Sequence, residues 1–88
     1  TCELYCASQH IHLGYKEFEI MKHLMSHPEM ITSKDDLIVS VWGSESDATD
    51  NNVEVYISFL RKKLKFIKSK VSIKVIRKVG YRLEVCDD

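Results

Sequence analysis

The sequence predicts one α+β domain in which a β-hairpin, three helices and a second β-hairpin follow one another. Apolar residues alternate with polar ones near both ends of the chain and recur at helical spacing between them. The chain has 88 residues, of which 44% are hydrophobic, and this is enough for one compact core. We therefore expect a single domain over residues 1–88.

An N-terminal hairpin is expected from two short alternating segments. Cys2–Cys6 and Ile11–Leu13 alternate, and the polar segment Ser8–His10 between them predicts the turn. We expect one face of this hairpin to be buried.

The first helix is expected to run from Lys16 to about His27, because Pro28 disfavours a helical conformation in the residue before it. The second is expected to be capped by Ser33 and to stop at Gly43. The two predicted apolar stripes are Phe18, Met21, Leu24 and Met25, and Leu37, Ile38, Val41 and Trp42.

A polar and acidic segment, Ser44–Thr49, predicts a loop before the third helix. That helix is expected to begin at a cap formed by Thr49 or Asp50 and to run to about Ile67. Its predicted core stripe is Val53, Ile57, Leu60 and Leu64.

The last third of the chain predicts a second hairpin. Val71–Val75 and Tyr81–Val85 alternate, and Arg77–Gly80 forms the turn between them.

Charge is unevenly distributed, although the net charge is zero. Residues 1–49 hold eight acids and three bases, whereas residues 51–83 hold one acid and ten bases. This distribution indicates one basic face. Such a face is equally consistent with nucleic-acid binding and with a solvated lysine-rich surface.

The face of the third helix opposite its core stripe has an unusual composition. It combines two amides, a hydroxyl, two apolar side chains and a base, which suit base edges in the major groove. Arg61 and Lys65 flank this face and Lys63 and Lys68 lie near the core edges, where we expect them to meet phosphates. A dimer or partner-protein surface is the alternative. The outer residues are Asn51, Asn52, Val55, Ser58, Phe59 and Lys62.

Residues suited to catalysis, metal binding or cofactor binding do not form a recognisable set, so neither an enzyme nor a cofactor is expected. His23 and His27 are four residues apart, but Leu24 follows His23 where a zinc-protease motif has glutamate. Three cysteines without a signal peptide favour the reducing cytoplasm. Apolar runs fall short of the roughly 18 residues of a membrane span.

Several motifs in one register resemble the OmpR/PhoB family of response-regulator effector domains. The block Val53–Leu64 and Gly80-Tyr81-Arg82 are the most specific, and Leu13-x3-Glu17 and Val41-Trp42-Gly43 agree with them. The resemblance implies a winged helix-turn-helix fold that binds double-stranded DNA and regulates transcription in a bacterial two-component system. It also implies that this chain, which begins without Met, follows a receiver domain that drives dimerisation. The family's N-terminal sheet usually has four strands, whereas this chain has room for about two.

The resemblance further implies roles for individual residues. Phosphate contacts fall to Lys34, Trp42, Asn51, Asn52 and Tyr81. Base reading falls to Val55, Tyr56 and Phe59, with Ser58, Arg61 and Lys62 on or beside the same face, and the wing contributes Arg77 and Lys78.

Three residues depart from the family's pattern. Phe59 stands where arginine is common, Lys78 where glycine is usual and Val75 where threonine is usual.

The resemblance also implies that the loop Ser44–Thr49 faces RNA polymerase. The alternative function for the whole domain is a winged-helix module that binds a protein through the same helix face.

Overall fold

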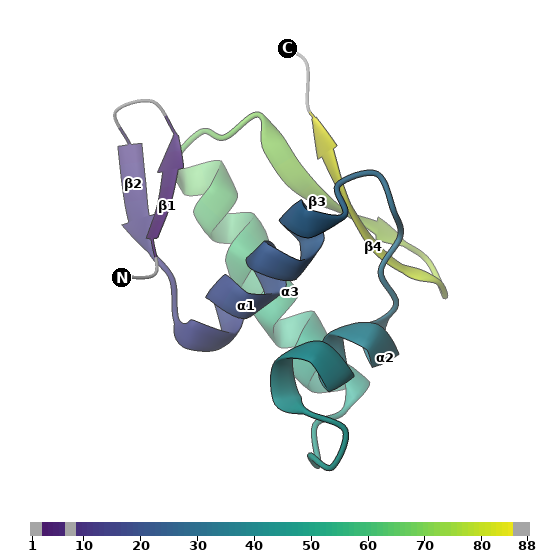
Figure 1. Ribbon diagram of the computed structural model, residues 1–88. Helices are drawn as coiled ribbons and strands as arrows, with labels where there is room; N and C mark the ends of the chain where they lie inside the picture. The colour runs from purple at the N-terminus through teal and green to yellow at the C-terminus, as the bar shows by residue number, and fades with distance from the viewer. Residues whose placement is uncertain (1–2, 7–8, 86–88) are drawn as a thin grey trace.

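The computed structural model describes residues 3–6 and 9–85, and its elements follow the predicted order (Figure 1). The β1–β2 and β3–β4 hairpins lie on opposite sides of the helices (Figure 1). The elements are β1 (Glu3–Cys6), β2 (Gln9–His12), α1 (Tyr15–Ser26), α2 (Lys34–Leu37), η1 (Ile38–Trp42), α3 (Asp50–Phe66), β3 (Val71–Ile76) and β4 (Gly80–Val85).

The N-terminal hairpin forms, but one detail of its prediction was wrong. β1 and β2 pair antiparallel with Cys6 opposite Gln9, so Gln9 and His10 belong to the strand and not to the turn. In β2, which lies at the edge of the helices (Figure 1), Ile11 is half-buried and the other residues are exposed. Leu13, the last residue of the predicted alternating segment, is buried in the core. The parts of the prediction that involve Cys2 and Ser8 lie outside the described residues.

Helix α1 begins and ends within one residue of its predicted bounds. Met21 and Leu24 of its predicted stripe are buried and Phe18 packs against the core. Met25, however, is 59% exposed, and Ile20 is fully buried instead. The buried face therefore includes position 20 and ends before position 25.

The second helix is capped as predicted, because the Ser33 hydroxyl accepts a hydrogen bond from the Asp36 backbone N–H at 3.1 Å. Its second half is a π-helical turn and not the expected α-helix. The Gly43 N–H donates to the Ile38 carbonyl, five residues earlier, at 3.0 Å. Gly43 has a φ of 99°, which glycine adopts at little cost and which ends the helix.

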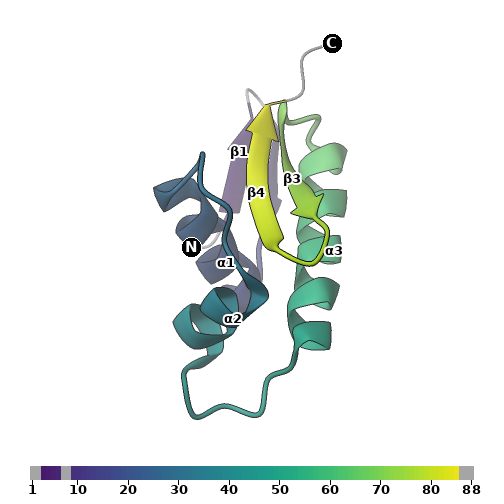
Figure 2. The ribbon, with the colours of Figure 1, turned by 90° about the vertical axis from the view of Figure 1, so that its right-hand side faces the viewer.

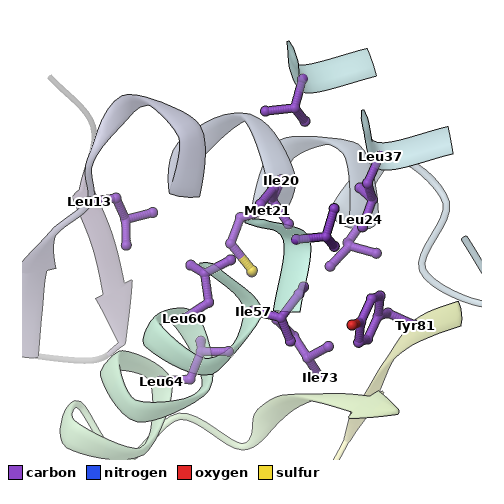
Figure 3. Close-up of a cluster of buried hydrophobic side chains, with 12 residues drawn as sticks. Leu13, Ile20, Met21, Leu24, Leu37, Ile57, Leu60, Leu64, Ile73 and Tyr81 are labelled. Atoms are coloured by element: carbon purple, nitrogen blue, oxygen red, sulfur yellow. The ribbon is translucent and has the colours of Figure 1, made fainter. Parts of the chain in front are cut away.

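Helix α3 begins at Thr49, one of the two predicted caps, and its four predicted core residues are all buried. These side chains meet those of α1, the second helix and the C-terminal hairpin in one hydrophobic cluster (Figure 3). The cluster contains Leu13, Ile20, Met21, Leu24, Leu37, Val41, Val53, Ile57, Leu60, Leu64, Ile73 and Tyr81.

The C-terminal hairpin is joined directly to the helical core. β3 and β4 pair antiparallel with Ile76 opposite Gly80, and the hairpin runs beside α3 (Figure 2). Thr32 and Tyr81 exchange two backbone hydrogen bonds of 2.8 Å, which connect β4 to the residue before the Ser33 cap. A Cβ atom on Gly80 would lie 2.1 Å from the Thr32 carbonyl oxygen, so only glycine allows this approach.

Candidate nucleic-acid interface

The outer face of α3 is open to solvent, as the sequence predicts. All six residues predicted to form it are exposed. Two of them are apolar: Val55 is 40% exposed and Phe59 is 45% exposed. Asn52 differs from the others because its side-chain oxygen accepts the Thr49 backbone N–H at 2.8 Å. That oxygen is therefore part of the helix cap, whereas Asn51 follows the cap on the exposed side.

A row of aromatic rings lies beneath one edge of this face. Tyr56 is half-buried and packs against the core. Its ring centroid lies 5.5 Å from that of Trp42 and 6.0 Å from that of Phe59. Of the three predicted base-reading residues, Val55 and Phe59 are thus exposed, and Tyr56 contacts Phe59 from the side of the core.

The inner end of this row is held by α1. The Lys16 Nζ atom lies 5.5 Å from the centroid of the Trp42 ring. The same atom donates a hydrogen bond to the Val41 carbonyl oxygen at 3.0 Å, near the end of the second helix, where a positive charge is favourable. Trp42, which the family resemblance places at a phosphate, is therefore a half-buried packing residue.

A cleft of about 580 Å³ separates α3 from β3. Basic and hydroxyl side chains line it together with apolar ones, and the predicted phosphate contacts among the basic residues are Lys34, Arg61 and Lys65. The Lys34 Nζ atom lies 3.7 Å from an oxygen of Glu54, which also lines the cleft. The basic and hydroxyl residues of the cleft are Lys34, Arg61, Lys62, Lys65, Ser58, Ser69 and Ser72.

Tyr81 also borders this cleft, but its side chain is a core residue with 2% exposure. Burial raises the pKa of its hydroxyl above the ordinary value, and the negative charges of Glu54 and Asp50 raise it further. The hydroxyl therefore stays protonated at neutral pH. For Tyr81 to contact a phosphate, that phosphate must enter the cleft.

Lys63 lies near the core edge, as the sequence predicts, and pairs with a buried carboxylate. Its Nζ atom lies 2.6 Å from Oε1 of Glu17 and donates to the His12 carbonyl oxygen at 3.1 Å. Glu17 is 4% exposed and also accepts the Gly14 N–H at 2.7 Å. A buried carboxylate needs such partners, because an unpaired buried charge is strongly destabilising.

Glu17 has no predicted role beyond its place in the Leu13-x3-Glu17 motif. An acid in the first turn of a helix is usually explained by the helix dipole alone. Its pairing with Lys63, 46 residues later, is visible only in the folded chain.

The tip of the C-terminal hairpin presents Arg77, Lys78 and Val79 to solvent. Lys78 has a φ of 66°, in the left-handed region that favours glycine. This is the position where the family usually has glycine. The lysine therefore adds a charge at the tip and a backbone conformation unfavourable for its side chain.

The loop Ser44–Thr49 projects from the end of the molecule next to α2, away from both ends of the chain (Figures 1 and 2). Glu45 and Asp47 are exposed in it. The predicted loop is confirmed.

Within the described part of the chain, His, Cys, Asp and Glu side chains form no group of three that is suited to a metal ion. Among the same residues, no helix has the length and apolar character that a membrane span requires.

A three-helix core with a C-terminal hairpin packed beside the third helix defines a winged helix-turn-helix domain. Residues 8–83 match the family described as "Transcriptional regulatory protein, C terminal", and the chain belongs to this family. The family consists of transcriptional regulators and is not a family of enzymes. Both the predicted fold class and the predicted family are confirmed.

Similar sequences are response regulators. The heme response regulator HssR of Staphylococcus epidermidis is 38% identical over 82 residues, and the transcriptional regulatory protein DltR of Streptococcus agalactiae is 40% identical over 82 residues. Each alignment covers 93% of this chain but only 37% of the relative. The chain thus corresponds to little more than a third of these proteins.

Similar solved structures are DNA-binding domains. That of Bacillus subtilis CssR has a TM-score of 0.81 at 28% identity, covering 93% of this chain and 90% of the other. The AdeR DNA-binding domain in complex with an intercistronic region has a TM-score of 0.83 at 27% identity. This match covers 97% of this chain and 87% of the other. The Klebsiella pneumoniae RstA DNA-binding domain in complex with the RstA box has a TM-score of 0.76 at 30% identity. This match covers 91% of this chain and 80% of the other.

Proposed function

We propose that this domain binds double-stranded DNA in a sequence-dependent manner and regulates transcription as the output domain of a two-component response regulator. The observation that carries the proposal is the exposed face of α3 beside a basic cleft, in a chain of this family. The AdeR and RstA domains, which have the same fold, were solved with DNA.

In this proposal α3 enters the major groove with its outer face toward the bases. Val55, Ser58 and Phe59 face base edges, Asn51 meets a phosphate at the start of the helix, and Lys62 lies toward the end of the same face. One DNA strand follows the cleft, where basic and hydroxyl side chains meet its phosphates. These contacts fix the position of the helix in the groove, and the outer face supplies the sequence preference.

The hairpin tip reaches the neighbouring minor groove. Arg77 is the side chain we assign to the groove itself, because a narrow A·T-rich minor groove attracts arginine electrostatically. Lys78 beside it is assigned to the flanking phosphates.

The remaining assignments concern the whole regulator. We propose an upstream receiver domain that brings two copies together on DNA, and a cytoplasmic setting without catalysis or a cofactor. Ser44–Thr49 is assigned to RNA polymerase, since Glu45 and Asp47 would repel phosphates. Replacing both acids with alanine should leave operator affinity unchanged or slightly higher while altering transcription in vitro. A large loss of operator affinity in the folded variant would contradict this assignment.

Selection of bound sites from random duplexes tests the function directly. We expect one enriched half-site, and binding that weakens by about 0.9 log units per neutralised phosphate for each log unit of salt. Lys65→Ala should lower that salt slope without changing the selected sequence. Recovery of unrelated sequences, with affinity insensitive to salt, would reject DNA as the ligand.

The alternative is a protein-binding module that uses the same helix face. Two observations favour it: the net charge is zero, and the exposed face contains Val55 and Phe59. Failure of the site selection, together with capture of a partner protein that Phe59→Ala abolishes, would support this alternative.

A further inference from the structure

The two apolar side chains on the outer face of α3 are not explained by phosphate contacts or hydrogen bonds. Val55 and Phe59 are 40% and 45% exposed and lie four residues apart, so they share one face of the helix. A phenylalanine ring cannot hydrogen-bond to a base edge. The apolar group that the major groove displays is the 5-methyl group of thymine.

Basic side chains around this pair indicate a polyanionic partner. Lys62 lies on the same exposed face, and Arg61 and Lys65 line the cleft on the side of the hairpin. A partner with negative charges at the edges and an apolar centre matches a thymine-containing major groove.

The Phe59 ring is held in a defined direction before any ligand arrives. It meets the Tyr56 ring edge-on, with a centroid distance of 6.0 Å and an interplanar angle of 86°. Tyr56 packs on Trp42, and the Lys16 ammonium group lies 5.5 Å from the Trp42 ring centroid. A side chain ordered in advance loses less rotamer entropy on contact.

We propose that Phe59 and Val55 read the methyl groups of two thymines in each half-site and that Tyr56 is a positioning residue for Phe59. This inference rests on the DNA-binding function proposed above. The pair is separated by about 6 Å along the helix axis. Successive bases rise about 3.4 Å per step, so the two thymines are at most about two steps apart.

Deoxyuridine substitution tests the proposal, because it removes only the methyl group of a thymine. The probe is the duplex recovered by site selection, with each thymine replaced in turn. At two positions we expect the affinity of the 88-residue chain to fall about fourfold, the value of one buried methyl-sized group. Phe59→Ala should abolish the effect at one position and Val55→Ala at the other.

The control variant is Phe66→Ala, which removes another exposed ring, 69% exposed, from the end of the same helix. It should leave both deoxyuridine effects intact. An equal deoxyuridine effect in wild type and Phe59→Ala, or no sensitive position at all, would overturn the proposal. Selection with Phe59→Arg should shift the preference toward guanine, and an unchanged preference would also count against it.

The positioning role of Tyr56 requires separate variants. Tyr56→Phe keeps the ring and should keep the deoxyuridine effect at the Phe59 position, whereas Tyr56→Leu should reduce it with the selected sequence otherwise unchanged. Thermal unfolding of both variants separates this effect from loss of fold. Equal methyl discrimination in folded Tyr56→Leu would remove Tyr56 from the proposal.

Failure of this inference differs from failure of the proposed function. If selection yields a half-site whose binding depends on salt but not on thymine methyl groups, only the methyl reading is wrong. If selection yields no enriched half-site and the affinity is insensitive to salt, DNA binding itself is rejected.

Discussion

The two hairpins of this domain have the same antiparallel geometry but are attached to the helices differently. The C-terminal hairpin contributes Ile73 and Tyr81 to the core and is joined to Thr32 by two backbone hydrogen bonds. In the N-terminal hairpin, β2 contributes a half-buried Ile11 and is linked to α3 by the Lys63 ammonium group on the His12 carbonyl oxygen. The first attachment depends on close backbone packing, and the second on a hydrogen bond from the Lys63 side chain, which also pairs with Glu17 of α1. Two hairpins of the same geometry are thus attached to one helical core by different kinds of contact.

Gly80→Ala should have the largest effect and tests the backbone attachment. The added Cβ would meet the Thr32 carbonyl oxygen at 2.1 Å, so the bridge must open or the hairpin must shift. We expect a loss of about 3 kcal/mol or more in the free energy of unfolding, measured by urea denaturation. Gly14→Ala, between β2 and α1, is the matched control.

A Cβ on Gly14 would lie 3.3 Å from Oε1 of Glu17, a contact that a shift of a few tenths of an ångström relieves. The loss there should be about 1 kcal/mol, the usual difference between glycine and alanine at a helix cap. Equal losses in the two variants would mean that the two hairpins are not attached differently.

Lys63→Met tests the ion-pair attachment. It leaves the Glu17 carboxylate, whose side chain is 6% exposed, without its cation. We expect the free energy of unfolding to fall by about 2 kcal/mol. This loss is smaller than that for breaking a fully buried pair, because water reaches Lys63. Amide hydrogen exchange in β2 should accelerate as well. Lys62→Met, at the exposed neighbouring position, should change stability by less than about 0.5 kcal/mol, and similar values for both variants would refute the role of the pair.

Arg77→Ala compares the tip of the C-terminal hairpin with its base. We expect a loss of about tenfold, or 1.4 kcal/mol, in affinity for the selected duplex. Lys70, just before β3, carries the same charge at the other end of the hairpin, and Lys70→Ala should lose much less affinity. A titration at fixed salt in which both variants lose equally would remove the tip from the interface.

Lys78→Gly separates the stability of the tip from its binding. Glycine relieves the positive φ, so we expect the free energy of unfolding to rise by about 0.5 kcal/mol. Affinity for DNA should fall because a charge is lost. Val79→Gly, in the same turn, should instead lower stability. A destabilised Lys78→Gly would show that the lysine side chain stabilises the turn.

The smallest effect concerns Tyr81 and appears only at alkaline pH. Because its pKa is raised in the folded state, the unfolded chain releases this proton first as the pH rises through about 10. The contribution of Tyr81 to the free energy of unfolding is therefore present below about pH 10 and is lost as the pH rises further. Tyr81→Phe should lose less stability than wild type between pH 9 and about 11, whereas Tyr15→Phe, on the surface, should follow wild type.

Local patterns predicted the elements well because each depends on neighbouring residues. The stripe Val53, Ile57, Leu60 and Leu64 and the caps at Ser33 and Thr49 depend on helical geometry and local hydrogen bonds. The outer face of α3 followed from the same geometry, since the residues opposite a buried stripe are exposed. The motifs in one register also identified the family correctly.

The sequence by itself thus determined the order of the elements, the core stripe and outer face of α3, and the family. Tertiary structure alone decided that Lys63 pairs with Glu17 and that Tyr56 packs on Trp42. It also decided that Gly80 must be glycine because of Thr32. The physical reason is that these features join residues far apart in the chain, so they depend on which elements pack together and not on local periodicity.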